Sequence, residues 1–346
     1  MSEDRRQRRA TVHDVARAAG VSLATVDRVL NGRPGVRPET AAKVDAAIRA
    51  LDFRRDLSAS LLARARDLRV LFLIPDGKNE FMHSLRAAIA RRARSARAER
   101  LRLETRDVGA LDAPALARAL DGLAPHQCDC VVIVATEDAA VHDAVAAATR
   151  RGIPVMTLVS DLPGSARKLF VGIDNVAAGR TAASLMGRFC GAGRIGLIAG
   201  SLGLRDHRER LEGFTAVMRT EFPRLALLDP VEGHDQDEAT ARFAADLLAA
   251  HPDLAGIYNL GAGNSGLLAA VEASGRAGQV RVIAHELSPP TRAGLLSGAV
   301  DVVLDQDPEG EIGAAIAAAR ALALGEDGDG RPAPIEIGVF LRDNLR

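Results

Sequence analysis

The sequence predicts an α/β protein in which a small all-helical N-terminal domain precedes two doubly wound subdomains, each built on a parallel sheet. Three observations predict this architecture. Residues 11–50 place their apolar side chains at helical spacing. From Arg69 onward, apolar runs of four to six residues alternate with longer helical stretches, which is typical of parallel sheets covered on both faces. The 277 residues that follow Arg69 are too many for one small sheet, so we expect two subdomains.

The N-terminal segment predicts three short helices. Thr11 stands three residues before Asp14, which is the spacing of a helix N-cap with an acid in the first turn. Gly20 supplies a permissive backbone in the turn that follows. Ser22 is placed to cap the second helix, and Pro38 suits the first position of the third. Two helices joined by a short turn containing glycine form a helix-turn-helix.

The charge of the chain is unevenly distributed although its net value is zero. Residues 1–69 carry 15 Lys and Arg against 9 Asp and Glu, whereas the remaining residues carry 30 against 36. A basic N-terminal domain on an acidic body suggests that this domain meets a polyanion. A charged, solvated face without a partner is the alternative interpretation.

The second predicted helix offers residues for contact with DNA. In a helix-turn-helix this helix enters the major groove, where its N-terminal residues meet base edges. The residues at those positions are Leu23, Ala24, Asp27 and Arg28. Ser22 and Thr25 stand where hydroxyls reach phosphates, which fixes register without reading sequence. Because generic matches to this motif are common, an ordinary three-helix bundle is the alternative.

The body predicts alternating strands and helices. Strands are expected at Val70–Pro75, Leu101–Thr105, Cys130–Ala135, Pro154–Val159, Leu169–Ile173, Arg194–Ala199, Gly256–Leu260, Val280–His285 and Asp301–Asp305. Helices are expected at Phe81–Ala98, Val176–Cys190, Glu209–Glu221, Glu238–Ala250 and Pro308–Leu324. Ligands of open parallel sheets bind at the carboxyl ends of the strands. The polar residues at those ends are Asp76, Asn79, Ser160, Asp161, Ser201, Asn259, Asn264, His285, Glu286, Asp305 and Gln306, with Arg208 on a following helix.

One glycine motif favours a different function. Residues 261–266 read Gly-Ala-Gly-Asn-Ser-Gly after a predicted strand, and Glu286 follows about twenty residues later, as in a dinucleotide-binding fingerprint. The motif lies late in the body, whereas the fingerprint belongs to the first strand–helix unit. The same glycines would let the backbone approach a sugar. We therefore expect no cofactor and no enzyme activity, with a dinucleotide-dependent enzyme as an alternative.

The N-terminal run Thr-Val-His-Asp-Val-Ala-Arg-Ala-Ala-Gly-Val-Ser-Leu-Ala-Thr-Val-Asp-Arg-Val-Leu-Asn, residues 11–31, closely resembles the DNA-binding signature of the lactose-repressor (LacI/GalR) family. The resemblance implies that Leu23 and Ala24 most affect operator choice. It implies that Leu62, flanked by Ala59 and Ala63, is the hinge residue that wedges into the minor groove. Asp27 stands where the family usually has serine.

The resemblance extends over the body, which is similar to a periplasmic sugar-binding fold. It implies a DNA-binding domain at residues 1–51, a hinge at 52–68 and an effector-binding and dimerisation domain at 69–346. The chain would cross between the two subdomains near residues 171–174, 304–308 and 330–336.

The same resemblance implies which residues contact the effector. Arg208 matches the arginine that contacts inducer, with Arg205 and Arg210 as local alternatives. Glu286 stands where many members have a ligand-binding aspartate, and Gln306 matches a pocket position. Asn79 and Phe81 resemble an Asn-x-Phe motif in which the aromatic ring covers a sugar. Ser160, Asp161, Asn259 and Asn264 are placed by strand ends alone.

These expectations combine into a ligand-responsive transcriptional regulator. We expect a homodimer that binds a double-stranded DNA operator and a small polar effector, most simply a sugar or polyol, in the cytoplasm. A purine or sugar phosphate effector remains an alternative, as does a solute-binding protein of a transporter. Cys128, Cys130 and Cys190 are an odd number without framework spacing, and we expect reduced thiols and no metal site.

Overall fold

The structure, a computed structural model, describes residues 11–30, 35–51, 67–324 and 334–345. The N-terminal domain consists of α1 (Val12–Ala19), α2 (Leu23–Leu30) and α3 (Pro38–Ala50). Its core contains Val15 and Ala16 of α1, Val26 of α2 and Val44 and Ala47 of α3. The turn after α1 is closed by Gly20, whose φ of 65° is left-handed and therefore suits glycine.

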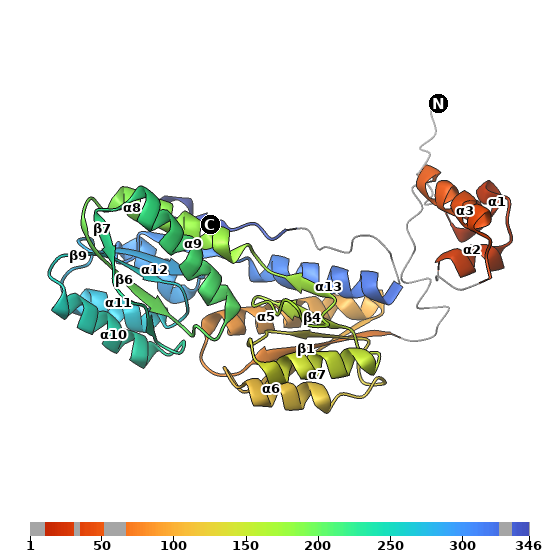
Figure 1. The fold of residues 1–346 in the computed structure, drawn as a ribbon, viewed down its shortest axis with the longest axis horizontal. Coiled ribbons are helices and arrows are strands. Elements are labelled where there is room, and N and C mark those ends of the chain that lie inside the picture. The colour runs from red at the N-terminus through yellow and green to blue at the C-terminus, as the bar shows by residue number, and fades with distance from the viewer. Residues whose placement is uncertain (1–10, 31–34, 52–66, 325–333, 346) are drawn as a thin grey trace.

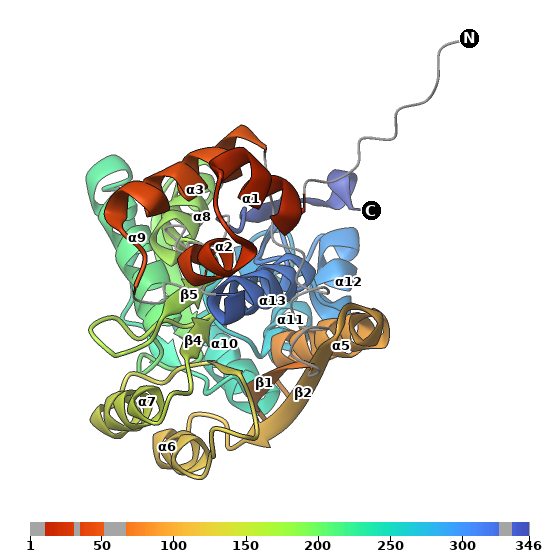
Figure 2. The same ribbon diagram turned by 90° about the vertical axis from the view of Figure 1, so that its right-hand side faces the viewer.

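The first subdomain of the body is a five-stranded parallel sheet in the order β2-β1-β3-β4-β5. Its strands are β1 (Leu68–Pro75), β2 (Leu101–Val108), β3 (Cys130–Ile133), β4 (Val155–Leu158) and β5 (Leu169–Val171). Figure 2 shows the sheet between two helical layers. Helices α5 (Glu80–Ala96) and α13 (Pro308–Leu324) cover one face, and α6 (Ala113–Asp121) and α7 (Ala139–Arg150) cover the other.

The second subdomain has a sheet in the order β12-β11-β10-β9-β6-β7, with β8 paired to β6. Its strands are β6 (Gly193–Ala199), β7 (Leu225–Leu227), β8 (Val231–Glu232), β9 (Leu254–Asn259), β10 (Arg281–His285), β11 (Val302–Asp305) and β12 (Gly338–Phe340). Only β12 is antiparallel. Helices α8 (Asn175–Phe189) and α9 (Arg205–Glu221) cover one face, and α10 (Asp237–Ala250), α11 (Asn264–Ala273) and α12 (Pro289–Ser297) cover the other.

The chain passes between the subdomains at points close to two of the predicted crossovers. It leaves the first sheet after Val171 and enters α8 at Asn175. It leaves the second sheet after Asp305, and α13 returns to pack on α5 and β1 of the first subdomain (Figure 1). Strand β12 then lies in the second sheet again. A cleft between two bodies joined by several crossovers can open and close.

The structure contains all nine predicted strands and adds three short ones, β7, β8 and β12. Helix α9 begins at Arg205, four residues before its predicted start, and β1 begins at Leu68, inside the predicted hinge. The rest of the hinge, residues 52–66, lies outside the described residues. No described helix has the length and apolarity that a membrane crossing requires.

Candidate functional site

The N-terminal ends of helices α1 and α2 are capped by side chains. The Thr11 hydroxyl donates to the Asp14 carboxylate at 2.6 Å, and the Asp14 backbone N–H donates to the Thr11 hydroxyl at 3.4 Å. At the start of α2, the Thr25 N–H donates to the Ser22 hydroxyl at 3.1 Å, and the two hydroxyls lie 2.9 Å apart. These bonds fix the points at which α1 and α2 begin.

The predicted base-reading residues share the solvent face of α2. Val26 is fully buried in the three-helix core, whereas Leu23, Ala24, Asp27 and Arg28 are exposed. Leu23 is 42% exposed. An exposed leucine at the start of this helix is suited to apolar contact with a DNA base. The other predicted DNA contacts, Asn31, Ala59, Leu62 and Ala63, lie outside the described residues.

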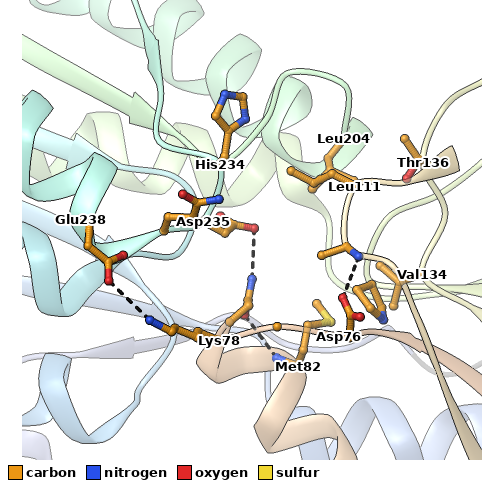
Figure 3. A pocket seen from close by; sticks show the side chains of 15 residues that line it. Asp76, Lys78, Met82, Leu111, Val134, Thr136, Leu204, His234, Asp235 and Glu238 are labelled. Atoms are coloured by element: carbon orange, nitrogen blue, oxygen red, sulfur yellow. Dashed lines mark hydrogen bonds and ion pairs between the residues drawn. The ribbon is translucent and has the colours of Figure 1, made fainter.

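Two adjoining cavities lie between the subdomains at the carboxyl ends of the strands. The outer chamber has a volume of about 350 Å³ and lies among the segments 75–82, 110–111 and 234–238 (Figure 3). The inner chamber has a volume of about 40 Å³ and reaches Ser160 and Glu286. Both chambers are lined by Asn79, Met82, Val134, Leu204 and Asp235.

Strained backbone concentrates around these chambers. Seven described residues other than glycine have a left-handed φ. Five of them line a chamber. Leu111 and His234 line the outer chamber, Val159 and Glu286 line the inner chamber, and Asp235 lines both. Left-handed backbone is costly for leucine, for glutamate and above all for β-branched valine, and less so for histidine and aspartate. Because such strain tends to cluster where ligands bind, its position favours the cleft as the functional site.

Arg210 is the cation of the inner chamber. Its side chain is only 2% exposed. Its Nε donates to Asn175 Oδ1 and its Nη1 to the Leu260 carbonyl, both at 2.9 Å. Its Nη2 has no hydrogen-bond partner within the described chain and lies 4.0 Å from Asp206 Oδ2. A buried guanidinium that is held on two sides and unpartnered on the third is ready to bind a ligand oxygen.

Glu286 faces Arg210 across the inner chamber. Gln306 Nε2 donates to its Oε1 at 2.5 Å. Its Oε2 and the side-chain amide oxygen of Gln306, Oε1, have no partner among the described residues. The pKa of Glu286 is raised to about 8, mainly by burial and to a lesser degree by the Asp305 and Asp206 carboxylates, while Arg210 and the Gln306 hydrogen bond oppose the shift. Glu286 is therefore largely protonated at neutral pH and can donate to a ligand as well as accept.

A second buried carboxyl group lies nearby in the first turn of α13. Glu311 is fully buried, and neither of its oxygens has a partner in the described part of the chain. Burial and the neighbouring Glu286 raise its pKa well above the usual range. Behind the chamber, burial holds the pKa of His285 well below its usual value. The Tyr258 hydroxyl lies 2.8 Å from His285 Nε2. These groups add little net charge beside the site.

The two walls of the cleft are in direct contact. Asn79 caps α5 through its Oδ1 and donates from Nδ2 to Asp235 Oδ2 at 3.0 Å. Asp235 is held in turn by the Ala262 N–H at 2.8 Å. The Arg205 N–H donates to the Ser160 hydroxyl at 3.2 Å. Because Asn79 and Ser160 belong to the first subdomain and their partners to the second, the structure shows a closed cleft.

Comparison with known proteins assigns the chain to a protein family. Residues 11–56 match the family model described as bacterial regulatory proteins, lacI family. Residues 70–327, three quarters of the chain, match the periplasmic binding protein domain. The chain belongs to the lacI family of bacterial regulatory proteins. The predicted recognition and fold class are thereby confirmed.

Relatives of this lacI-family chain include catabolite control protein A of Staphylococcus xylosus, which is 45% identical over 75 residues, and the protein of the same name from Priestia megaterium, 44% identical over 79 residues. The aligned segments cover 22% and 23% of this chain and 23% and 24% of those relatives. Each alignment thus spans less than a quarter of the relative.

Solved structures resemble the body. A solute binding protein from Burkholderia graminis in complex with D-arabinose has a TM-score of 0.75 at 23% identity, and the match covers 81% of this chain and 97% of that one. GanP, a glucose-galactose binding protein from Geobacillus stearothermophilus, has a TM-score of 0.73 at 22% identity, with 81% and 99% covered. At these identities the likeness shows the fold.

The family's inducer-contacting arginine was assigned by sequence to Arg208, but the structure places Arg210 in the cleft of this lacI-family chain. Arg208 is 40% exposed, donates to the Leu202 carbonyl at 2.7 Å and pairs with Glu137 outside both chambers. Arg210 lies on the buried face of α9 with His207, Phe214 and Val217. The apolar spacing of Phe214, Val217 and Met218 is the sequence signal that could have selected Arg210 over Arg208.

The other predicted effector residues divide into two groups. Those that line the inner chamber are Asn79, Phe81, Ser160 and Glu286. Those outside both linings are Asp161, Asn259, Asn264, Gln306 and Arg208. Asp161 is paired with Arg167, whereas Gln306 acts behind Glu286. Asn259 donates to Asn264 at 2.8 Å, and Asn264 to the His285 carbonyl at 3.0 Å, so this pair supports the loop that carries Glu286.

Sequence reasoning missed Asp206, His207 and Asp235, which also line the inner chamber. Asp206 and His207 begin α9, whose start was predicted too late, and Asp235 follows the unpredicted β8. The glycine motif at 261–266 is accounted for by packing. A Cβ on Gly261 would lie 2.4 Å from the Gly200 nitrogen, and one on Gly266 would lie 1.8 Å from the Asp237 carbonyl oxygen. Within the described residues, no group of His, Cys, Asp and Glu is arranged to hold a metal ion.

Proposed function

We propose that this lacI-family protein is a transcriptional repressor that acts as a cytoplasmic homodimer on a double-stranded DNA operator. In this proposal α2 reads the operator through Leu23, Ala24, Asp27 and Arg28. Ser22, Thr25 and the N-terminal end of α1 at Thr11 position the domain on phosphates. A small polar effector, a sugar or polyol, binds in the cleft between the subdomains and controls DNA binding.

The observation that carries the effector site is the convergence of unpartnered polar atoms. Buried polar atoms in proteins are nearly always hydrogen-bonded. Arg210 Nη2, Asp206 Oδ1 and Glu286 Oε2 are buried without partners, and all three residues line the inner chamber. A ligand that supplies hydroxyl groups to these atoms would remove their desolvation penalty.

The chemistry of these atoms favours hydroxyls over phosphate. Hydroxyl groups both donate and accept, so they suit a chamber that is lined by three carboxyl groups and one guanidinium. A phosphate would place its charges beside the Asp206 and Asp235 carboxyl groups with Arg210 as the cation, and uncompensated buried charge is costly. Phe81 is only 5% exposed and lines the same chamber, where its ring can cover the apolar face of a sugar.

Control of DNA binding follows if the effector binds the closed cleft better than the open one. The contacts of Asn79 with Asp235 and of Ser160 with Arg205 exist only when the walls meet. An effector that also touches both walls adds to these contacts. Its differential affinity then shifts the population toward the closed form and moves the two subdomains that follow the DNA-binding domain in the chain.

Two arginines on α9 provide the test. We expect isothermal titration calorimetry of a sugar and polyol panel to find a ligand for the wild type. Arg210→Gln should weaken that ligand ten- to a hundredfold, because a charge-assisted hydrogen bond contributes about 1.5–3 kcal/mol. Arg208→Gln is the matched control and should weaken binding by no more than about fivefold, because Arg208 lines neither chamber and its ion pair with Glu137 of the first subdomain is exposed and therefore weak. Normal binding by a folded Arg210→Gln, or a preference of the wild type for a nucleotide or phosphosugar, would refute the proposed site.

A further inference from the structure

The two chambers differ in size. The inner chamber, at about 40 Å³, has room for about three water molecules, since one needs about 10–15 Å³ on this measure. The outer chamber, at about 350 Å³, is much larger. A sugar whose hydroxyls reach Arg210 and Glu286 would fill the inner chamber and extend into the outer one. Much of the outer chamber would remain for another group.

The outer chamber also differs in chemistry. Met82, Leu111, Val134 and Leu204 surround it with apolar side chains (Figure 3). Several of its polar groups already have protein partners. Asp76 Oδ1 accepts from the Ala110 N–H at 2.9 Å, and Lys78 Nζ lies 3.4 Å from Glu238 Oε1 across the mouth.

Asp235, which also lines the outer chamber, has both of its carboxylate oxygens bonded. The unpartnered buried atoms of Asp206, Arg210 and Glu286 belong instead to the inner chamber. Thr136, His234 and Gln236 also line the outer chamber, but more of its lining surface is apolar than polar, so it offers a ligand mainly apolar contact.

Leu111 is held in the outer chamber by an unfavourable backbone. Its φ is 55°, a conformation that Asn or Gly adopts more readily than leucine does. Leucine at this position raises the conformational energy of the backbone, and an asparagine in the same turn would lower that energy. Its contribution is apolar surface facing the cavity, where Figure 3 shows it near Leu204. The presence of a leucine at this strained position is an observation separate from the cavity's size, and it also indicates that the outer chamber is built for apolar contact.

We propose that the outer chamber is a second subsite for an apolar substituent, so that the effector is a glycoside: a sugar joined to an aromatic or alkyl group. This inference rests on the proposed effector site in the cleft. The sugar ring bonds to the inner chamber, and the substituent packs on Leu111, Leu204 and Met82. The Lys78–Glu238 pair at the mouth is exposed and therefore weak, so it can part to admit such a group.

Calorimetry on the full chain tests this subsite. The probes are D-arabinose, D-xylose, D-galactose and D-allose, each as the free sugar, as both methyl glycosides and as both phenyl glycosides. We expect a phenyl glycoside of the preferred sugar to bind about tenfold more tightly than the methyl glycoside, because the phenyl ring buries more apolar area. Leu111→Asn, which suits the backbone better, should reduce that preference to threefold or less and leave the free sugar's affinity unchanged.

Two further variants complete the experiment. Ala110 is exposed and lines the outer chamber only, so Ala110→Glu should fold normally and also reduce the phenyl preference. Leu296→Asn is the matched control, because Leu296 is an exposed leucine of α12 that lines neither chamber. Equal or weaker binding of the phenyl glycosides while a free sugar binds would overturn the subsite and leave the proposed function standing. A phenyl preference that survives in both Leu111→Asn and Ala110→Glu would overturn its location. Failure of every probe would overturn both proposals.

Discussion

Glu286 should make the folded protein less stable as the pH rises. Its pKa is about 8 in the folded chain, because it is buried beside Asp305 and Asp206, against about 4.3 for an exposed glutamate. Between these values the folded state holds a proton that the unfolded chain releases. Stability is therefore lost from about pH 4 to about pH 8, by roughly 1.4 kcal/mol for each unit of pKa difference and on the order of 5 kcal/mol in total.

Glu286→Gln removes this cost while keeping an amide oxygen that Gln306 can bond. We expect the variant to be more stable than the wild type at pH 8 and nearly equal to it at pH 4. The raised pKa of Glu311 also makes the folded protein less stable as the pH rises. The stability of Glu286→Gln should therefore depend on pH less steeply than that of the wild type, but it should not be independent of pH.

Tyr258 is the only tyrosine in a chain without tryptophan, and it is buried in the second subdomain with Glu286. Its fluorescence during urea unfolding at pH 5, 6, 7 and 8 measures the effect. Parallel pH profiles of wild type and Glu286→Gln would refute the reasoning.

Three other changes test separate parts of the molecule. Leu62→Ala should weaken specific operator binding and spare effector affinity, because it removes the side chain expected to wedge into DNA and belongs to the predicted hinge, not to the predicted effector site; an operator affinity within about twofold of wild type, by fluorescence anisotropy, would contradict the hinge assignment. Asp27→Ser should either change operator preference at one symmetric pair of positions or raise affinity for all DNA and steepen its salt dependence. Selection from random DNA with salt titrations distinguishes these outcomes, and no change in either would show that Asp27 does not contact DNA. Gly179→Ala should lower the unfolding midpoint strongly, because a Cβ there would lie 2.0 Å from the Arg210 carbonyl oxygen where α8 packs on α9. Gly191→Ala, with open space around it, should change it little.

The sequence predicts the architecture well because buried parallel strands carry continuous apolar runs. β3 is fully buried, and its four residues Cys130–Ile133 are recognisable from sequence for that reason. Strands β7, β8 and β12 have only two or three residues and lie at or near the edges of their sheet. Short edge strands have no such run, so local patterning does not predict them.

The site was harder to predict because it depends on helix rotation and on loops. Arg208 and Arg210 are two residues apart, and a turn of 100° per residue separates a surface arginine from the buried one. Asp235 contacts Asn79 from a loop 156 positions away in the chain. Its backbone is left-handed, and no pattern in the local sequence predicts that conformation. Residues selected only for standing at strand ends, such as Asp161 and Asn259, are positioned by partners that no local pattern shows.

The most direct test of effector control is the affinity of the full-length protein for its operator with and without the sugar or glycoside that calorimetry identifies. Fluorescence anisotropy on a duplex selected from random DNA would measure it for the wild type, Arg210→Gln and Arg208→Gln. We expect effector to change the operator affinity of the wild type and of Arg208→Gln at least tenfold. We expect the operator affinity of Arg210→Gln to be normal without effector and to change little or not at all when effector is added. A full response in Arg210→Gln, or no response in the wild type, would contradict control of DNA binding through Arg210.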